Sequence, residues 1–107
     1  MAKFFIKWWP EPTLFPSTKP EELFKIVCSL CEMVKADLKA GAMKDWGCEP
    51  GGWSGYTIAE GVNETELSTT LQKYVPYIHF EVTPVLTVHQ LVESVNKAVA
   101  AAKSAKK

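Results

Sequence analysis

The chain has 107 residues, of which 47% are hydrophobic, and this composition is typical of one globular domain with a buried core. Twelve lysines balance twelve carboxylates and arginine is absent, which disfavours nucleic acid or an anionic membrane as a partner. No apolar run approaches the roughly 20 residues of a membrane helix. The first residues lack a signal-peptide pattern. An odd number of cysteines, three, without such a signal indicates that the thiols are reduced. These features predict a cytoplasmic protein.

The first half of the chain predicts a strand, a long helix and a second strand. Residues 3–9 alternate apolar and more polar side chains, as a half-buried strand does. Thr18 ahead of Pro20 predicts the start of a helix, and Gly41 predicts its end. A second strand is expected over residues 42–48. The inward positions of the first strand and the helix are Phe4, Ile6, Trp8, Leu23, Val27, Leu30, Val34 and Leu38.

The second half predicts two more strands with a helix between them. A third strand is expected over residues 55–60 and a fourth over residues 77–83. Asn63 with Glu66 predicts the capped start of the intervening helix, because the two side chains can each accept a hydrogen bond from the other's backbone. The inward positions of this helix are Leu67 and Leu71.

A third helix is expected after the fourth strand. Thr87 with Gln90 predicts its capped start, and apolar side chains then recur at helical spacing. These apolar positions are Leu91, Val92, Val95 and Val99. The helix fades into a lysine-rich end, so we expect a single ferredoxin-like domain over residues 1–102 and a tail over residues 103–107.

The element order β-α-β-β-α-β-α predicts an α+β protein: a ferredoxin-like βαββαβ fold with an added C-terminal helix and a four-stranded antiparallel sheet. Helices cover one face of such a sheet, and the other face must be solvated or covered by something else. A second copy can cover this open face and form a homodimer. Alternatively, the third helix can fold back over it.

Strand alternation assigns side chains of the fourth strand to the two faces. Ile78, Phe80 and Val82 should face the helices, and His79 and Glu81 should lie on the open face. Further side chains expected on the open face are Tyr77, Thr83, Phe5, Lys7 and Trp9. So much aromatic surface is unusual on a solvated sheet, which favours the homodimer.

The fourth strand also carries a family resemblance. The run Phe80-Glu81-Val82-Thr83-Pro84-Val85-Leu86, which follows a third strand ending Ala59-Glu60-Gly61, resembles the family named domain of unknown function 3303. That family is similar in architecture to the dimeric α+β barrel superfamily. The resemblance implies a dimeric ferredoxin-like subunit, and it brings no catalytic residues with it. Relatives in the superfamily include cofactor-independent monooxygenases, isomerases and ligand-binding regulators, so the fold leaves the function open.

The open face holds the candidate catalytic pair His79 and Glu81, with Lys7 expected alongside on the neighbouring strand. A histidine beside a carboxylate can act as a general base, because the carboxylate orients the ring and raises its pKa. The alternative is that these side chains form polar pairs across a dimer interface and fix its register.

Candidate ligand-binding residues are the aromatic and cationic side chains expected near that face. They are Lys7, Trp9, Trp46, Tyr56 and Tyr77. The side on which Trp46 lies is ambiguous, because Lys44, Trp46 and Cys48 share one face of its strand and Met43, Asp45 and Gly47 share the other. The glycine-rich segment 49–54 predicts a hairpin loop rather than a phosphate-binding loop, since a strand follows it, and Trp53 in this loop is a candidate lid.

We expect no metal and no cofactor. His79, Glu81 and His89 do not form a converging motif of three or four ligands. Cys28 and Cys31 lie inside the first helix beside its apolar stripe, where small buried hydrophobic side chains are usual, and no second cysteine pair completes a zinc site.

Three functional hypotheses follow. The first is a homodimeric domain that binds a small molecule, in a pocket on the open sheet face or between the sheet and its helices. The second is a non-catalytic interaction or regulatory module whose open face is the self-association surface. The third is a cofactor-independent enzyme of the isomerase or monooxygenase kind.

Overall fold

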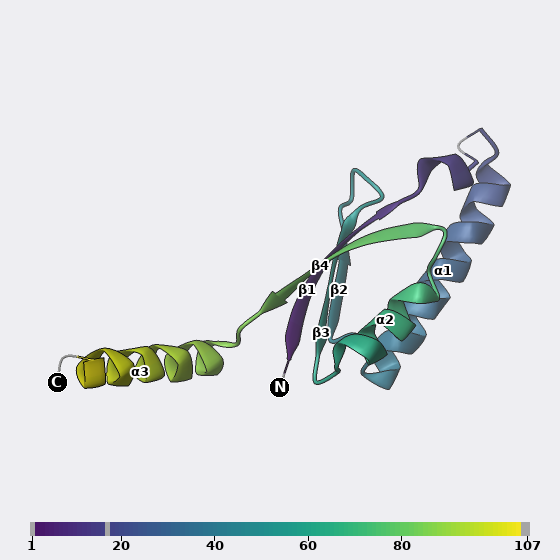
Figure 1. The fold of residues 1–107 in the computed structure, drawn as a ribbon. Helices are drawn as coiled ribbons and strands as arrows, with labels where there is room; N and C mark the ends of the chain where they lie inside the picture. The colour runs from purple at the N-terminus through teal and green to yellow at the C-terminus, as the bar shows by residue number, and fades with distance from the viewer. Residues whose placement is uncertain (1, 17, 106–107) are drawn as a thin grey trace.

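The computed structural model describes residues 2–16 and 18–105, and it contains a four-stranded antiparallel sheet with the strand order β2-β3-β1-β4 (Figure 1). The strands are β1 (Lys3–Pro10), β2 (Asp45–Cys48), β3 (Gly55–Glu60) and β4 (Ile78–Val85). The helices are α1 (Pro20–Ala40), α2 (Glu64–Gln72) and α3 (Val88–Ala105), with a 3-10 turn at Pro12–Leu14. This is the ferredoxin-like α+β arrangement that the sequence predicts, with β4 at one edge and β2 at the other.

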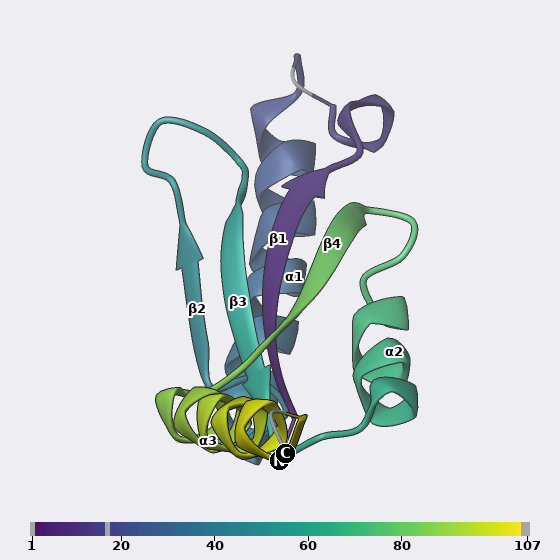
Figure 2. The ribbon, with the colours of Figure 1, turned by 60° about the vertical axis from the view of Figure 1, so that its left-hand side comes forward.

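The two faces of the sheet differ in what covers them. Figures 1 and 2 show α1 and α2 on one face, with the other face open. Phe4, Ile6 and Trp8 of β1 point toward the helices and are 2%, 0% and 7% exposed, as their alternation predicts. Leu67 and Leu71 of α2 join this core, which confirms their inward positions.

The ends of α1 and α2 agree with two of the expected capping residues and differ from a third. Asn63 and Glu66 form the reciprocal capping box expected at the start of α2. The end of α1 is also as expected: Gly41 has a positive φ of 81°, a conformation that favours glycine. The expected Thr18 cap is wrong, because Pro20 is the first residue of α1 and the capping position therefore falls on Lys19, whose side chain makes no capping hydrogen bond.

The strands β2 and β4 differ from their expected ranges by a few residues. Strand β2 begins at Asp45 rather than at residue 42, because Met43 is buried in the core beneath α1. Strand β4 runs from Ile78 to Val85, and Tyr77 lies just before it. Because β4 is an edge strand, Val82 is 40% exposed although it points to the side of the helices.

Helix α3 projects away from the rest of the molecule (Figure 1). None of its residues from Val88 to Ala105 is buried, and the molecule measures 70 × 25 × 22 Å. The alternative in which this helix folds back over its own sheet is therefore wrong. The helix also continues to Ala105, past the expected limit at residue 102; residues 106–107 of the expected tail lie outside the described residues. No helix within the described ranges is long and apolar enough to cross a membrane.

Candidate functional site

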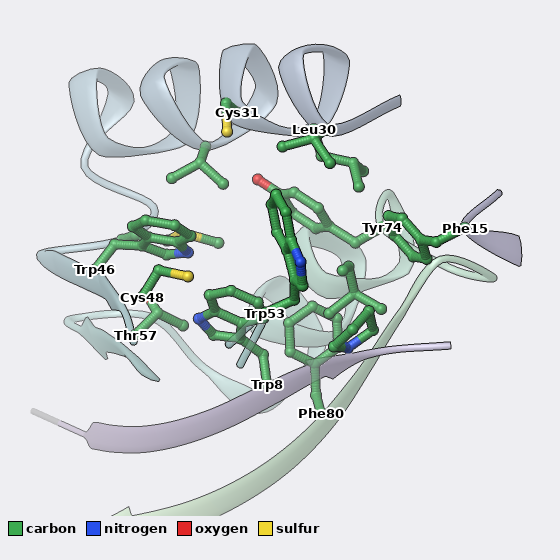
Figure 3. A pocket seen from close by; sticks show the side chains of 15 residues that line it. Trp8, Phe15, Leu30, Cys31, Trp46, Cys48, Trp53, Thr57, Tyr74 and Phe80 are labelled. Carbon is green, nitrogen blue, oxygen red and sulfur yellow. The ribbon is translucent and has the colours of Figure 1, made fainter. Parts of the chain in front are cut away.

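A cavity of about 240 Å³ lies between α1 and the helix-facing side of the sheet. Figure 3 shows side chains from α1, from β1, β2 and β4, and from the loop before β3 converging on it. Aliphatic side chains of α1 form one side of it, and aromatic rings from the sheet and its loops form much of the rest. The side chains that define its walls are Trp8, Leu30, Cys31, Met43, Trp46, Cys48, Trp53, Tyr74 and Phe80.

Two stacked tryptophans form one wall of the cavity. The rings of Trp8 and Trp46 are 5.2 Å apart between centroids and inclined by 12°. The Nε1 atom of Trp8 donates a hydrogen bond of 3.2 Å to the backbone oxygen of Tyr56. Because this indole N–H already has its partner, Trp8 presents an apolar surface to the cavity.

The opposite wall is anchored by a buried polar network. Tyr74 packs edge-on against Phe80, with 6.0 Å between centroids, and its hydroxyl donates a 2.6 Å hydrogen bond to Oδ2 of Asp37. The ammonium of Lys73 pairs with the other oxygen of Asp37. Burial is the main cause that raises the pKa of Tyr74 far above its usual range. The hydrogen bond to Asp37 and the charge of Asp37 raise this pKa further, so the hydroxyl stays protonated.

Two further polar side chains of the cavity wall have hydrogen-bond partners. The hydroxyl of Thr57 donates to the backbone oxygen of Asp45 at 2.7 Å, and the thiol of Cys48 lies 3.5 Å from the backbone oxygen of Glu49. Burial raises the pKa of Cys48, and the neighbouring Cys31 and Glu49 raise it further, so Cys48 is a neutral thiol rather than an activated nucleophile. The cavity therefore offers mainly apolar, polarisable contact and no charged side chain.

Trp53 and Phe15 flank the cavity, and neither comes from a regular helix or strand. Trp53 is 50% exposed and comes from the glycine-rich loop between β2 and β3. Figure 3 shows its indole among the rings that surround the cavity. A half-exposed aromatic side chain on a loop can move without disrupting the sheet, so Trp53 is suited to act as a lid.

The expected catalytic pair lies outside this cavity, on the open face. His79 and Glu81 share that face, and Glu81 is opposite Lys7 in the register of β1 and β4, as the alternation predicts. His79, however, stacks on Trp9 at 5.9 Å, and its Nε2 atom lies 3.3 Å from Oε1 of Glu11. The carboxylate beside this histidine is therefore Glu11, a residue that sequence reasoning missed because it follows β1 in a proline-rich segment.

Glu11 itself is held by its local backbone. Its carboxylate accepts hydrogen bonds of 3.1 Å from both the backbone N–H and the hydroxyl of Thr13. The backbone hydrogen bond from Thr13, and then the hydrogen bond with His79, lower the pKa of Glu11. The side chains of His79 and Glu11 are 48% and 31% exposed, so this pair is open to solvent.

The expected ligand-binding residues are divided among three places. Lys7, Trp9 and Tyr56 border a shallow depression on the open face. Tyr77 lies before β4 and packs edge-on against Phe15 at 6.1 Å. Trp46 lies on the side of the helices, opposite the fully buried Thr57, and is the one of the five that lines the apolar cavity. The side on which Trp46 lies, which the sequence leaves ambiguous, is therefore the side of the helices.

The cysteines of α1 differ in their environment. Cys31 faces the cavity, whereas Cys28 is exposed, so the expectation of a packed position is wrong for Cys28. Within residues 2–16 and 18–105, His, Cys, Asp and Glu side chains do not gather in groups of three or more that could hold a metal ion.

Comparison with protein families gives one result. The profile of the family described as Domain of unknown function (DUF3303) matches residues 2–99, which covers every strand, α1, α2 and most of α3. A comparison with curated proteins finds no match. With the family profile spanning nearly the whole chain, the protein belongs to the DUF3303 family.

Proposed function

We propose that this protein binds a small, uncharged, flat apolar molecule in the cavity between α1 and the sheet. The observation that carries the proposal is a partly open pocket of about 240 Å³ in which no lining residue is charged. Among the described residues, no buried side-chain nitrogen or oxygen lacks a hydrogen-bond partner. A polar ligand would therefore lose its hydration without replacement, whereas an apolar ligand would gain contact with the stacked rings.

The volume of the cavity limits the size of the ligand. Drug-sized ligands occupy pockets of roughly 300–1,000 Å³, and an apolar cavity of about 150 Å³ is enough to hold benzene. The 240 Å³ of this cavity therefore fits a molecule of one or two fused rings. Trp8, Trp46 and Trp53 would lie against it, so binding should change the tryptophan fluorescence.

The test compares two leucines of α1 that differ in where they point. Leu30 lines the cavity, and Leu38 is 38% exposed. Leu30→Trp should fill the cavity and weaken binding of naphthalene at least tenfold, whereas Leu38→Trp should leave it unchanged; fluorescence titration and isothermal calorimetry measure both. Equal affinity for naphthalene in the two variants, or no binding by the wild-type protein, would refute the proposal.

We also propose that the open sheet face is a self-association surface, as a homodimer requires. The face carries stacked rings that no described helix covers: Phe5 and Tyr56 lie 6.3 Å apart between centroids, and Trp9 is 42% exposed. Lys7 opposes Glu81 in register, so the charges of the face are balanced. The net charge of zero also removes long-range repulsion between copies. Light scattering after size-exclusion chromatography should give twice the monomer mass of 11.9 kDa.

A further inference from the structure

Helix α3 carries an apolar stripe without a tertiary partner. Its members are Val88, Leu91, Val92, Val95 and Val99, which are 79%, 51%, 54%, 50% and 47% exposed. The opposite side of the helix is polar and includes an ion pair of 3.1 Å between Glu93 and Lys97. Most helical stability in proteins comes from packing an apolar face against other segments rather than from the helix alone. The stripe is therefore a surface that a partner should cover.

The connection to β4 directs α3 away from its own sheet. Leu86 and Thr87 alone separate β4 from α3. Thr87 is locked by reciprocal hydrogen bonds with Gln90: the Thr87 N–H donates to Oε1 of Gln90 at 2.9 Å, and the Gln90 N–H donates to Oγ1 of Thr87 at 3.1 Å. Such a capping box satisfies two backbone N–H groups at the start of the helix and so defines where α3 begins. Figures 1 and 2 show the result: α3 leaves on the open side of the sheet, opposite to α1 and α2.

The surface best suited to this stripe is the open sheet face of a second copy. One chain carries both an uncovered apolar helix and an uncovered aromatic sheet face, and it cannot join them itself. A two-fold pair joins both at once, because each copy gives its helix and receives the other's. Neither surface opposes this contact electrostatically, since the stripe has no charged residue and Lys7 is balanced by Glu81 opposite it.

The contact area can be estimated from the two surfaces. Four strands spaced by about 4.8 Å, each about six residues long, give a face about 20 Å across. The stripe of an 18-residue helix is about 27 Å long and about 10 Å wide, so it would cover roughly 200 Å² of the partner's face. Each copy gives one stripe and one face, roughly 400 Å² of flat area, and side-chain relief increases the accessible area, which places the contact among the smaller specific interfaces.

We propose that α3 is an exchanged arm: in a homodimer, the α3 stripe of each copy packs on the open sheet face of the other. This inference rests on the self-association proposed above and specifies how it is made. It also gives α3 a role in assembly that is separate from the apolar cavity, which lies on the other side of the sheet.

The first test compares a carboxylate placed inside the apolar stripe of α3 with one placed outside it. Val95→Asp puts a carboxylate in the stripe, and Ser94→Asp puts the same group one position away, outside it. We expect Val95→Asp to raise the dimer dissociation constant at least 100-fold and Ser94→Asp to change it less than threefold, as measured by analytical ultracentrifugation. Circular dichroism should show that both variants keep the α1, α2 and sheet signal. A monomeric wild-type protein would refute both self-association and the arm, whereas a Val95→Asp variant as dimeric as wild type would refute the arm alone.

The second test asks whether the helix and the sheet face meet each other. Phe5→Asp damages the open face, Val95→Asp damages the arm, and each variant alone should be mostly monomeric. Mixed in equal amounts, they can form a heterodimer in which an intact arm meets an intact face once. Association in the mixture should therefore exceed that of either variant alone at the same total concentration. If α3 pairs instead with the partner's α3, or the sheets pair directly, the mixture will associate no more than the separate variants, and the arm proposal fails.

Discussion

The Nε2 atom of His79 lies 3.3 Å from Oε1 of Glu11, across 68 positions of sequence, while Glu81 two residues away on the same strand faces Lys7. The strand β4 fixes which face His79 occupies, but the segment that follows β1 decides which carboxylate it meets. The carboxylate beside His79 is therefore Glu11 rather than the expected Glu81, and the pair lies outside the apolar cavity.

The pKa of Glu11 offers a direct check of that relationship. The hydrogen bonds from Thr13, and secondarily from His79, lower this pKa below its ordinary value of 4.5. The stabilisation that they provide is present above the unfolded pKa and is lost as the pH falls through the folded one. Carbon-detected NMR should show the Glu11 carboxylate titrating below 4.5, and His79→Ala should raise its midpoint only partly, because the Thr13 contacts remain. A Glu11 midpoint at or above 4.5 would contradict the geometry.

The bond between Tyr74 and Asp37 should dominate the alkaline behaviour of the protein. Burial and Asp37 raise the pKa of Tyr74, so this group stays protonated in the folded state while the unfolded tyrosine ionises above about pH 10. Its contribution to stability is therefore complete below that pH and declines above it.

Tyr74→Phe tests this directly. Removing a hydrogen bond to a charged group should cost about 1.5–3 kcal/mol in the free energy of unfolding at pH 7. The difference between wild type and Tyr74→Phe should then shrink between about pH 10 and 11, as followed by urea unfolding. A difference that stays constant over this pH range would show that Tyr74 does not carry the effect.

Gly55 is required because β2 and the Trp8 ring approach it closely. A Cβ atom built on Gly55 would lie 1.9 Å from the backbone oxygen of Gly47 and 2.8 Å from the ring of Trp8. Gly55→Ala should therefore displace β2, disturb the tryptophan wall of the cavity and cost at least the 1–3 kcal/mol typical of overpacking. Gly51→Ala is the matched control, since nothing lies within 4 Å of its added carbon, and should change stability by less than about 0.5 kcal/mol. Urea unfolding with a fluorescence readout measures both, and equal stabilities would contradict the packing.

Much of the fold follows from local patterns. The alternation of Phe4, Ile6 and Trp8 identified the buried side of β1, and Asn63 with Glu66 identified the start of α2. Both features depend on residues a few positions apart, whose geometry in a strand or a helix is fixed by the backbone. Thr18 shows the limit even here, because the position of Pro20 moved the cap to Lys19.

The candidate site depended on contacts that no local pattern encodes. Trp46 lies on a strand of only four residues, too short for its alternation to assign a face, and its pairing with Thr57 put it on the side of the helices. The cavity then required α1 to lie over Trp46 and Trp8, residues that are far apart in the sequence.

By itself, then, the sequence determined the element order, the inward residues of β1 and α2 and the open sheet face, because backbone periodicity ties these to neighbouring positions. The expected inward position of Leu38 in α1 is wrong, because this side chain is 38% exposed near the end of the helix. Only the tertiary structure decided that the apolar space lies beneath α1, that His79 meets Glu11 and that α3 leaves its own sheet. The physical reason is that strand register, helix placement and the angle of a two-residue connection are set by packing between distant segments.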